Sequence, residues 1–497
     1  MKRKPQYLII FEHIIQQIYT GKITIGDRLD SIKSMSEEYM VSKNTIKTVI
    51  KMLSEKGFIE TKAGSRPVLI QSTSKQSIES DLLYEKILQI SEIYKIFSLI
   101  FPSIAMYNIK RFTSKDFEEL NEIIDCMEKN SSNYLVFKEQ RLKYINKLIS
   151  KTNNFLIHHF CEIIQHDVII SQLAYNFDNL DNLDNLDNLD NCCIDFFRNK
   201  YIEQVRKTYL YGLDGNLIEF KKLLTYMYKA CRESILKMVE NRAPQSIDTS
   251  SFNSVTLEKC YLYDLIVSDV ICQIFEGNIK IGDCLPSITS IINRYNVSLP
   301  TVRSAYNELN ELGIAKTING KGTYVTLFSE YDDDYINTEE GAKRLSLLLY
   351  AMEFVTITLE DVVLLLGNKM DLIAVDKIET HLRYLQNNCE ECKVYPDFVL
   401  LCKIVDYTQI YVLQETFLHL KQYMIFGIYL ERFFHEEYNE ILKTRFDVCF
   451  EILRYLKKGD VERFAESFSN IFKESLQYLK KVISSLNVDM RVKLDIL

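Results

Sequence analysis

The feature that most constrains this chain is a long internal repeat. When Ile14 is placed on Val270 and both stretches are read forward without gaps, about twenty residues are identical over more than fifty positions. "GKITIGDRLDSI" in the first copy aligns with "GNIKIGDCLPSI" in the second. A period of about 250 residues is far longer than that of a solenoid. The sequence therefore predicts a tandem duplication of a two-domain unit.

Each copy of the repeat is followed by about 170 residues with helical apolar spacing. The chain of 497 residues has only 15 Gly and 7 Pro, and 47% of it is hydrophobic against 26% charged. These proportions are typical of a globular, mainly helical protein. The stretch "NRAPQSIDTSSFNSVT", residues 241–256, is rich in Ser, Thr and Asn and predicts a linker between the halves.

In the first copy, residues 42–57 have the pattern of a short amphipathic helix. Ser42 is a good N-cap, and Gly57 is a good C-terminal stop. Apolar residues at i, i+3, i+4 and i+7 predict one buried stripe: Ile46, Val49, Ile50 and Leu53. The opposite face is polar and cationic: Lys43, Asn44, Lys47 and Lys51.

A shorter helix through Ile32, Met35 and Tyr39 precedes this one, and few residues are left between them for anything but a tight turn. Two short helices joined in this way predict a helix-turn-helix, whose second helix fits the major groove of B-DNA. The next stretch, "FIETKAGSRPVLI", predicts strand, glycine turn and strand, which make a hairpin wing. Gly64 in that turn lets the backbone approach a phosphate or a minor groove.

These segments resemble the GntR family of bacterial winged-helix transcription regulators. The second copy has "GDCLPSI", "VSLPTVRSAYNELNELGI" and "GKGTYV" in the order and spacing of that family. The first copy, with "GDRLDSI", "VSKNTIKTVIKMLSEKGFI" and "AGSRPVLI", is a looser match. There Asp30 replaces the usual proline, Lys47 replaces the usual arginine, and the wing glycine pair is reduced to Gly64.

The resemblance implies DNA contacts in both copies. In the first copy the implied residues, together with neighbours chosen for their charge or polarity, are Lys33, Ser42, Lys43, Asn44, Thr45, Lys47, Gly64 and Arg66. In the second copy they are Ser298, Thr301, Arg303, Gly320 and Lys321. Lys47 and Arg303 stand where the family has an arginine near base edges or backbone, and the others are implied phosphate contacts. The net charge of −8 does not oppose this, because residues 1–72 hold twelve Lys and Arg against seven Asp and Glu.

The segments after the two copies resemble the all-helical ligand-binding domain of the fatty-acid-regulator branch of the family. The resemblance implies a small-molecule effector. Many members of that branch hold a metal with one Asp and three His, but here Tyr144-Ile145 stands where a Phe-His pair belongs. The two later histidines have no counterpart near Cys449 or Ile471. We therefore expect no metal and no cofactor.

Other metal patterns are weak. Cys389 and Cys392 form a lone C-x-x-C, and the "NFDNLDNLDNLDNLDN" stretch of residues 176–191 lacks the glycine turn and terminal Glu of a calcium loop, so we predict an acidic surface loop there. His158, His159 and His166 have no suitably spaced carboxylate, which favours solvated or core histidines.

The predicted fold is mainly α, with two winged helix-turn-helix domains of α+β type, each followed by an all-α bundle. The predicted domains are residues 1–74 and 257–328 for the winged helices, and 75–245 and 334–497 for the bundles. The basic, then apolar N-terminus is interrupted by Glu12 and His13, and the most apolar later stretch contains acidic residues. We expect no membrane segment and a cytoplasmic location.

We therefore expect a transcription regulator that binds double-stranded operator DNA and responds to an effector. The chain could form an internal pseudo-dimer or a homodimer. The alternative is a winged-helix scaffold or antagonist that binds proteins and little DNA. An enzyme is not expected, because about 170 residues after Val325 are too few for the aminotransferase-like domain of another branch, and no nucleophile elbow, nucleotide loop or H-E-x-x-H occurs.

Overall fold

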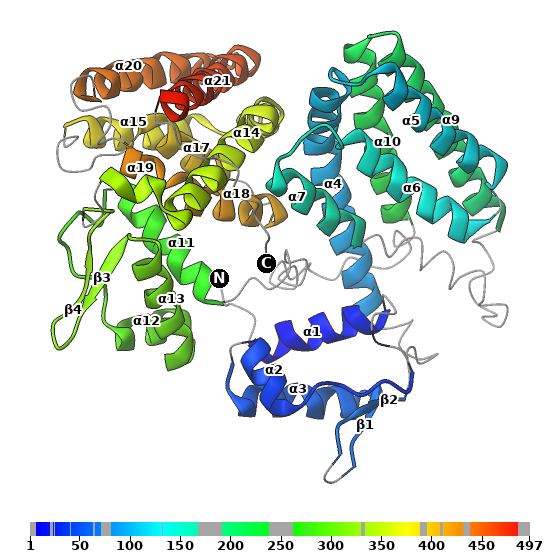
Figure 1. Cartoon of the computed structure of the whole chain (residues 1–497), viewed down its shortest axis with the longest axis horizontal. Helices are drawn as coiled ribbons and strands as arrows, with labels where there is room; N and C mark the ends of the chain where they lie inside the picture. The colour runs from blue at the N-terminus through cyan, green and yellow to red at the C-terminus, as the bar shows by residue number, and fades with distance from the viewer. Residues whose placement is uncertain are drawn as a thin grey trace. The chain divides into compact units, whose positions relative to one another are not determined.

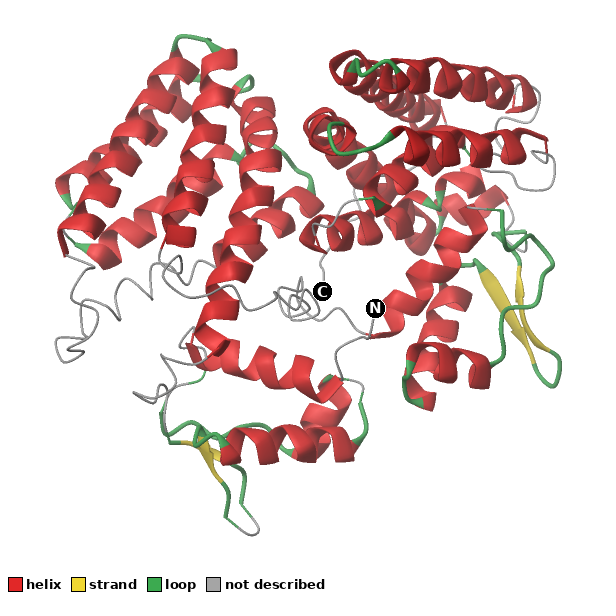
Figure 2. Ribbon diagram, turned by 180° about the vertical axis from the view of Figure 1, so that it is seen from behind, coloured by secondary structure: helices red, strands yellow, loops and turns green. Residues whose placement is uncertain are grey.

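The computed structural model divides the chain into two compact units. The first holds residues 1–36 and 43–258, and the second holds residues 259–497 together with 37–42. The structure describes residues 6–19, 23, 25–39, 41–62, 65–70, 81–131, 133–166, 191–237, 262–275, 277–329, 333–387, 395–407, 411–430 and 438–485. Helices dominate both units, and each has one small hairpin of strands (Figure 1, Figure 2).

The first unit begins with a winged helix. Its elements are α1 (Gln6–Tyr19), α2 (Ile32–Glu38), α3 (Lys43–Glu55), β1 (Ile59–Glu60) and β2 (Val68–Leu69). Helix α3 packs on α1, and its buried residues are the predicted stripe of Ile46, Val49, Ile50 and Leu53. The helical period of 3.6 places these four side chains on one face, so the prediction of the stripe is confirmed. Helix α2 ends one residue before Tyr39, which was predicted to belong to it.

The second unit begins with the same arrangement. Its elements are α11 (Leu262–Phe275), α12 (Ile288–Tyr295), α13 (Leu299–Glu311), β3 (Ala315–Ile318) and β4 (Gly322–Val325). Both hairpins are antiparallel, and in each the last strand also bridges the segment before the second helix, at Arg28↔Val68 and Cys284↔Tyr324. That third segment completes the small sheet of a winged helix.

Backbone hydrogen bonds repeat between the two winged helices. Gly26 N–H donates to Leu69 O at 2.8 Å, and Gly282 N–H donates to Val325 O at 2.9 Å. Both glycines have positive φ, of 96° and 89°, which a side chain would disfavour. The predicted fold class, mainly helical with two winged helix-turn-helix domains, is confirmed.

Each winged helix is followed by a helical bundle. In the first unit the helices are α4 (Asp81–Ile109), α5 (Ser114–Lys129), α6 (Tyr134–Leu148), α7 (Phe155–His166), α9 (Asn191–Leu213) and α10 (Leu217–Lys237). In the second they are η2 (Asp333–Asn337), α14 (Glu339–Gly367), α15 (Leu372–Asn387), α17 (Pro396–Asp406), α18 (Tyr411–Met424), α19 (Gly427–Leu430), α20 (Tyr438–Lys457) and α21 (Val461–Ser485).

The two bundles pack their helices in the same pairs. Helix α4 packs on α10 as α14 packs on α21, and α5 contacts α6 and α9 as α15 contacts α17 and α20. Helices α4 and α14 both have 29 residues, and α5 and α15 both have 16. The duplication therefore extends through the bundles, where little sequence identity remains to indicate it.

A shared corner fixes the register of the last two helices in each bundle. Gly215 follows α9 with φ 72°, and Gly459 follows α20 with φ 77°. The next residue caps the last helix in both cases, because Asn216 Oδ1 accepts from Glu219 N–H and Asp460 Oδ1 accepts from Arg463 N–H. Residues of α9 and α10 can therefore be matched one by one to residues of α20 and α21.

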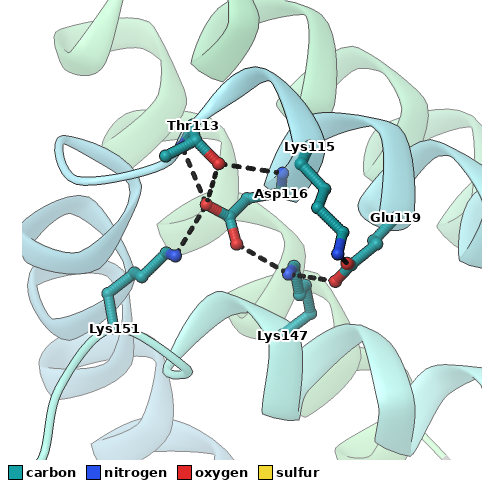
Figure 3. Close-up of polar contacts among 6 residues, drawn as sticks. All are labelled: Thr113, Lys115, Asp116, Glu119, Lys147 and Lys151. Carbon is teal, nitrogen blue, oxygen red and sulfur yellow. Dashed lines mark hydrogen bonds and ion pairs between the residues drawn. The ribbon is translucent and has the colours of Figure 1, made fainter.

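Asp116 holds the corner between α5 and α6 in the first bundle (Figure 3). Its carboxylate accepts from the backbone N–H of Thr113 at 2.8 Å and from Lys147 Nζ at 2.9 Å, and it forms an ion pair with Lys151 Nζ at 2.7 Å. Thr113 caps α5 in return, which completes a capping box. The side chains thus join the start of α5 to the end of α6 and the turn that follows.

Several sequence predictions lie outside the described residues: the linker at 241–256, the acidic stretch before Asn191, the cysteine pair Cys389 and Cys392, and the wing residue Gly64. Among the helices that the structure describes, none combines the length and apolarity needed to cross a bilayer.

Candidate nucleic-acid interface

Helix α3 presents a cationic face to solvent. Lys43, Asn44, Lys47 and Lys51 are exposed, and they lie opposite the buried stripe. Lys51 forms an exposed ion pair with Glu55 at 3.6 Å, one turn further along the helix. Such an exposed pair contributes little to stability. The helix therefore carries a row of lysines at a spacing suited to phosphates or base edges along a groove.

Helix α13 presents the same face with different chemistry. Four exposed positions of α13 match the four polar positions of α3. They hold Leu299, Pro300, Arg303 and Asn307, in the order of Lys43, Asn44, Lys47 and Lys51. Arg303 is therefore the single cation among these four positions. The guanidinium can donate two parallel hydrogen bonds to a guanine edge, which a lysine ammonium does less well.

A serine caps the N-terminus of α13, and the first copy has a serine at the matching position before α3. Ser298 is the N-cap, its hydroxyl accepts from Thr301 N–H at 3.4 Å, and the two hydroxyls lie 2.8 Å apart. Thr301 is only 3% exposed. Its side chain thus serves the helix cap, and a contact from Thr301 to DNA would have to come from its backbone. In the first copy, Ser42 is exposed and Thr45 is half-buried.

The remaining predicted residues lie on the wings and on α2. Lys33, on α2, and Arg66, on the segment leading to β2, are both exposed. In the second wing Gly320 has φ 76° and Lys321 is exposed beside it, so the tight turn presents a cation at the tip of the hairpin. The exposed predicted residues of each winged helix thus lie on the recognition helix, on the wing and, in the first copy, on α2.

The second recognition helix is also bonded to its bundle. Arg344, on α14, donates from Nη2 to the carbonyl of Glu311, the last residue of α13, while its Nε donates to Glu340 at 3.0 Å. Arg344 is 8% exposed. The carbonyls of a last helical turn have no partner within the helix, so this guanidinium caps α13.

Aromatic contacts extend the same junction within the second unit. The rings of Phe328, after the wing, and Phe426, before α19, meet edge to face at 5.6 Å, and Tyr335 lies 6.4 Å from Phe426. Helix α11 also packs on α18. The sequence analysis missed Arg344 and these aromatic residues. Their only sequence signal is a basic residue in the first turns of α14, which many helices have.

Burial affects one acidic residue close to this interface. Glu308, on α13, is half-buried, and desolvation together with nearby Glu311 raises its pKa, although Arg344 opposes the shift. The shift follows from the burial of this side chain, whereas Arg303 lies on the exposed face of α13.

The histidines and cysteines of the described segments form no cluster of metal ligands. No group of three or more His, Cys, Asp or Glu residues within these segments is arranged to hold an ion. His158 Nε2 lies 2.9 Å from the carbonyl of Thr152, a contact that orients the ring within the fold. Tyr144 and Ile145, at the expected Phe-His position, are both buried and supply no ring nitrogen.

Known proteins match both winged helices. The family model described as "Bacterial regulatory proteins, gntR family" matches residues 6–68 and 262–325. Over 146 residues the chain is 25% identical to the galactonate operon transcriptional repressor of Escherichia coli (strain K12), which covers 28% of this chain and 63% of that protein. Over 64 residues it is 41% identical to the mannosyl-D-glycerate transport/metabolism system repressor MngR of the same organism, covering 13% of this chain and 27% of that protein.

A solved structure also shows similarity. Streptococcus agalactiae GntR is 14% identical over 45% of this chain and 97% of that chain, with a TM-score of 0.22. The chain spans less than two thirds of the length of each of the two repressors. The sequence matches to the family model coincide with α1–β2 in one half and α11–β4 in the other. Each half of the chain therefore carries one segment, residues 6–68 or residues 262–325, that matches the gntR family of bacterial regulatory proteins.

Proposed function

We propose that this chain is a DNA-binding transcription repressor that responds to a small-molecule effector. The observation that carries the proposal is the exposed lysine row of α3, opposite a buried stripe, in a domain that matches the gntR model. The two repressors to which the chain is similar support the sign of regulation. The proposed contacts to DNA are those of the exposed predicted residues, with backbone contact at Thr301 and at the wing glycines, including Gly64.

In this proposal α3 supplies most of the electrostatic affinity and α13 supplies more of the sequence preference. Each lysine that neutralises a phosphate releases counterions, so binding through α3 depends steeply on salt. Arg303 suits direct contact with a guanine edge. Effector binding in a helical bundle alters the position of the winged helices. The bond from Arg344 to α13 is an example, in the second unit, of a bundle that is bonded to its own recognition helix.

The test uses the intact protein and sheared genomic DNA. Fragments retained by the protein are sequenced, and the recovered site is used in fluorescence anisotropy at a series of salt concentrations. For Lys43→Ala with Lys47→Ala, the slope of log K against log salt should decrease by about one to two units. A matched control is Lys369→Ala with Lys377→Ala, which removes the same charge from exposed positions of the second bundle and should leave the slope unchanged.

The alternative function is that of a scaffold that binds other proteins through its winged helices. A scaffold would retain genomic fragments without a common site, and its weak DNA binding would respond equally to the α3 variant and to the control. Either result would exclude sequence-specific regulation by these winged helices. We also propose a cytoplasmic location and no catalytic activity, on the basis of the regulatory proteins that the chain resembles.

A further inference from the structure

The interior of the first bundle contains an arginine surrounded by tyrosines. Arg141, on α6, lies close to Tyr94 of α4, Tyr201 of α9 and Tyr228 of α10, and Tyr144 lies one turn further along α6. The four tyrosines are at most 6% exposed, and Arg141 itself is half-buried. Four helices of the first bundle thus bring one cation and several phenols together.

Three of the four hydroxyl groups of this cluster lack hydrogen-bond partners among the described residues. Tyr144, Tyr201 and Tyr228 each bury a hydroxyl for which the described residues supply no partner with hydrogen-bond geometry. Tyr201 approaches Tyr228, and Tyr144 approaches Thr208, without reaching that geometry. Each buried polar group without a partner destabilises the folded state, because its hydrogen bonds to water are lost and not replaced. Three such groups in one place indicate a site that is completed by something else.

The charge of Arg141 is also uncompensated. Within the segments that the structure describes, no carboxylate forms an ion pair with this guanidinium. Burial alone would lower the pKa of Arg141, but Tyr94, Tyr201 and Tyr228 raise it, so the group stays protonated. A cation in a low-dielectric interior is costly unless an anion accompanies it.

Aromatic rings form the walls of the cluster. Phe97 meets Tyr228 edge to face at 4.5 Å, and Phe101 meets it at 5.5 Å. Tyr94 and Tyr228 lie 6.3 Å apart between centroids. A few polar groups within apolar, aromatic walls are the usual composition of a small-molecule site.

The second bundle has an arginine at the same level, and there it is neutralised. Arg445 occupies the position of Tyr201, as counted from the shared glycine corner. Its Nη1 donates to Asp397 at 2.8 Å, and its Nη2 donates to Ser475 at 2.9 Å, where Ser475 matches Cys231. Met352 and Phe472 stand in place of Tyr94 and Tyr228. The second bundle therefore supplies its own carboxylate and has no phenol at the positions of Tyr94, Tyr201 and Tyr228, although the ring of Tyr395 lies 5.2 Å from the Arg445 guanidinium.

We propose that the first bundle, and not the second, binds a small organic carboxylate at Arg141, with the hydroxyls of Tyr201 and Tyr228 as additional donors to its oxygens. In the second bundle, the ion pair between Asp397 and Arg445 is an example of a carboxylate bound to an arginine at this level of the fold. The proposal deepens the proposed function, since it names the chemical class of the effector and the half of the chain that takes it. It requires no metal ion.

The experiment measures thermal unfolding and titration calorimetry of the full chain with sodium benzoate and sodium succinate. Inorganic phosphate and the neutral amide benzamide serve as comparisons, all at constant ionic strength. We expect at least one carboxylate to raise the unfolding midpoint in a saturable way, because a ligand that binds only the native state stabilises it. Calorimetry should give one site per chain, and benzamide should have no effect.

Arg141→Met should weaken carboxylate binding on the order of thirtyfold or more, since truncating one partner of a buried charge pair is costly to binding. It should leave the midpoint of the ligand-free protein unchanged or higher, because an uncompensated buried charge is removed. Tyr201→Phe removes one hydroxyl without a partner, so it should preserve the fold and weaken binding. Arg206→Gln, which breaks ion pairs with Asp125 and Glu128 on the outside of α9, is the matched arginine control and should bind the carboxylate normally.

Four outcomes would overturn the proposal: no carboxylate shifts the midpoint, the shift survives in Arg141→Met, inorganic phosphate alone gives an Arg141-dependent shift, or two sites per chain are found. DNA retention is measured separately on the same samples. A chain that binds a carboxylate through Arg141 but retains no DNA would refute the proposed function and leave this site standing. A chain that binds DNA but no carboxylate would refute this site and leave the proposed function standing.

Discussion

At the scale of single residues, Asp116 shows how one carboxylate joins two helices. Burial alone would raise its pKa, but hydrogen bonds from Lys151, Thr113 and Lys147 lower it well below the usual range (Figure 3). The carboxylate therefore stabilises the folded state at every pH above its ordinary pKa near 3.9. As the pH falls below that value toward the folded pKa, this contribution is lost.

We predict that Asp116→Asn lowers the free energy of unfolding by about 2 kcal/mol at pH 7, because it weakens a capping box and two contacts with lysine. The difference from wild type should shrink below about pH 4, where the wild-type carboxylate loses its advantage. Urea unfolding at both pH values measures it. The control is Glu118→Gln, an exposed change on the same helix that should cost less than about 0.5 kcal/mol. A difference that grows on acidification would contradict the argument.

The two recognition helices differ at one matched position, where the first helix has Lys47 and the second has Arg303. We predict that Arg303→Ala changes base preference more than it changes the salt dependence of DNA binding, because a guanidinium can bond a guanine edge bidentately. One base pair of the recovered site should become less selective by about 1–3 kcal/mol. Selection of randomised sites with wild type, Arg303→Ala and Lys47→Ala measures this. Equal effects of the two variants on base preference would show that no such division exists.

At the scale of elements, the sequence predicts a feature well when all the residues that determine it lie within one helix. The stripe of α3, from Ile46 to Leu53, could be predicted because four residues at helical spacing share one face. The cap of α13 by Ser298 follows from the same local reasoning, yet the burial of Thr301 under it does not. Burial depends on which neighbouring element covers a residue, and that is not a property of the spacing.

The cluster around Arg141 could not be predicted in this way. Its members come from α4, α6, α9 and α10, and none has a spacing that points to the others. The prediction that a metal site is absent rested on a missing Phe-His pair, which says nothing about what fills the interior instead. Only the packing of α4 on α10, of α9 on α10 and of α6 on α4 brings the tyrosines to the arginine.

The hydrogen bond between Arg344 of α14 and the end of α13 predicts how stable the last turn of α13 is. Arg344→Met removes the guanidinium that caps the last carbonyl of α13, so the last turn of that helix should fray more often. Hydrogen exchange of a peptide spanning residues 305–314 should become faster, and the affinity for operator DNA should fall. Arg383→Gln, which breaks an ion pair within α15 and a contact with the ring of Phe450 on α20, is the control, since neither contact involves α13. Unchanged exchange in Arg344→Met would show that α13 does not depend on its bundle.

At the scale of the whole molecule, the duplication covers both winged helices and both bundles. Members of regulator families of this kind bind two half-sites as symmetric dimers. A single chain with two units can make both contacts itself, since the tether gives the second unit a high effective concentration. The two recognition faces differ at each of the four exposed positions compared above, so the two half-sites need not be alike.

We predict one chain per operator and an imperfect inverted repeat as the site. Light scattering of the protein, alone and with one operator duplex, measures the number of chains, and footprinting measures the half-sites. Exchanging the two half-sites in the duplex tests whether each winged helix prefers its own. Two chains on a perfect palindrome, with one winged helix of each chain in contact, would refute the pseudo-dimer.

The ion pair of Arg445 with Asp397 has a consequence for the shape of the response to the effector. A symmetric dimer has two equal sites, and occupation of one can make the other bind more tightly, which gives a steep dose–response curve. A chain in which one of the two arginines is already paired within its own bundle has a single site left to fill. Derepression should then follow a simple hyperbola with a Hill coefficient of about one, so transcription would track the effector in a graded manner over roughly two decades of concentration.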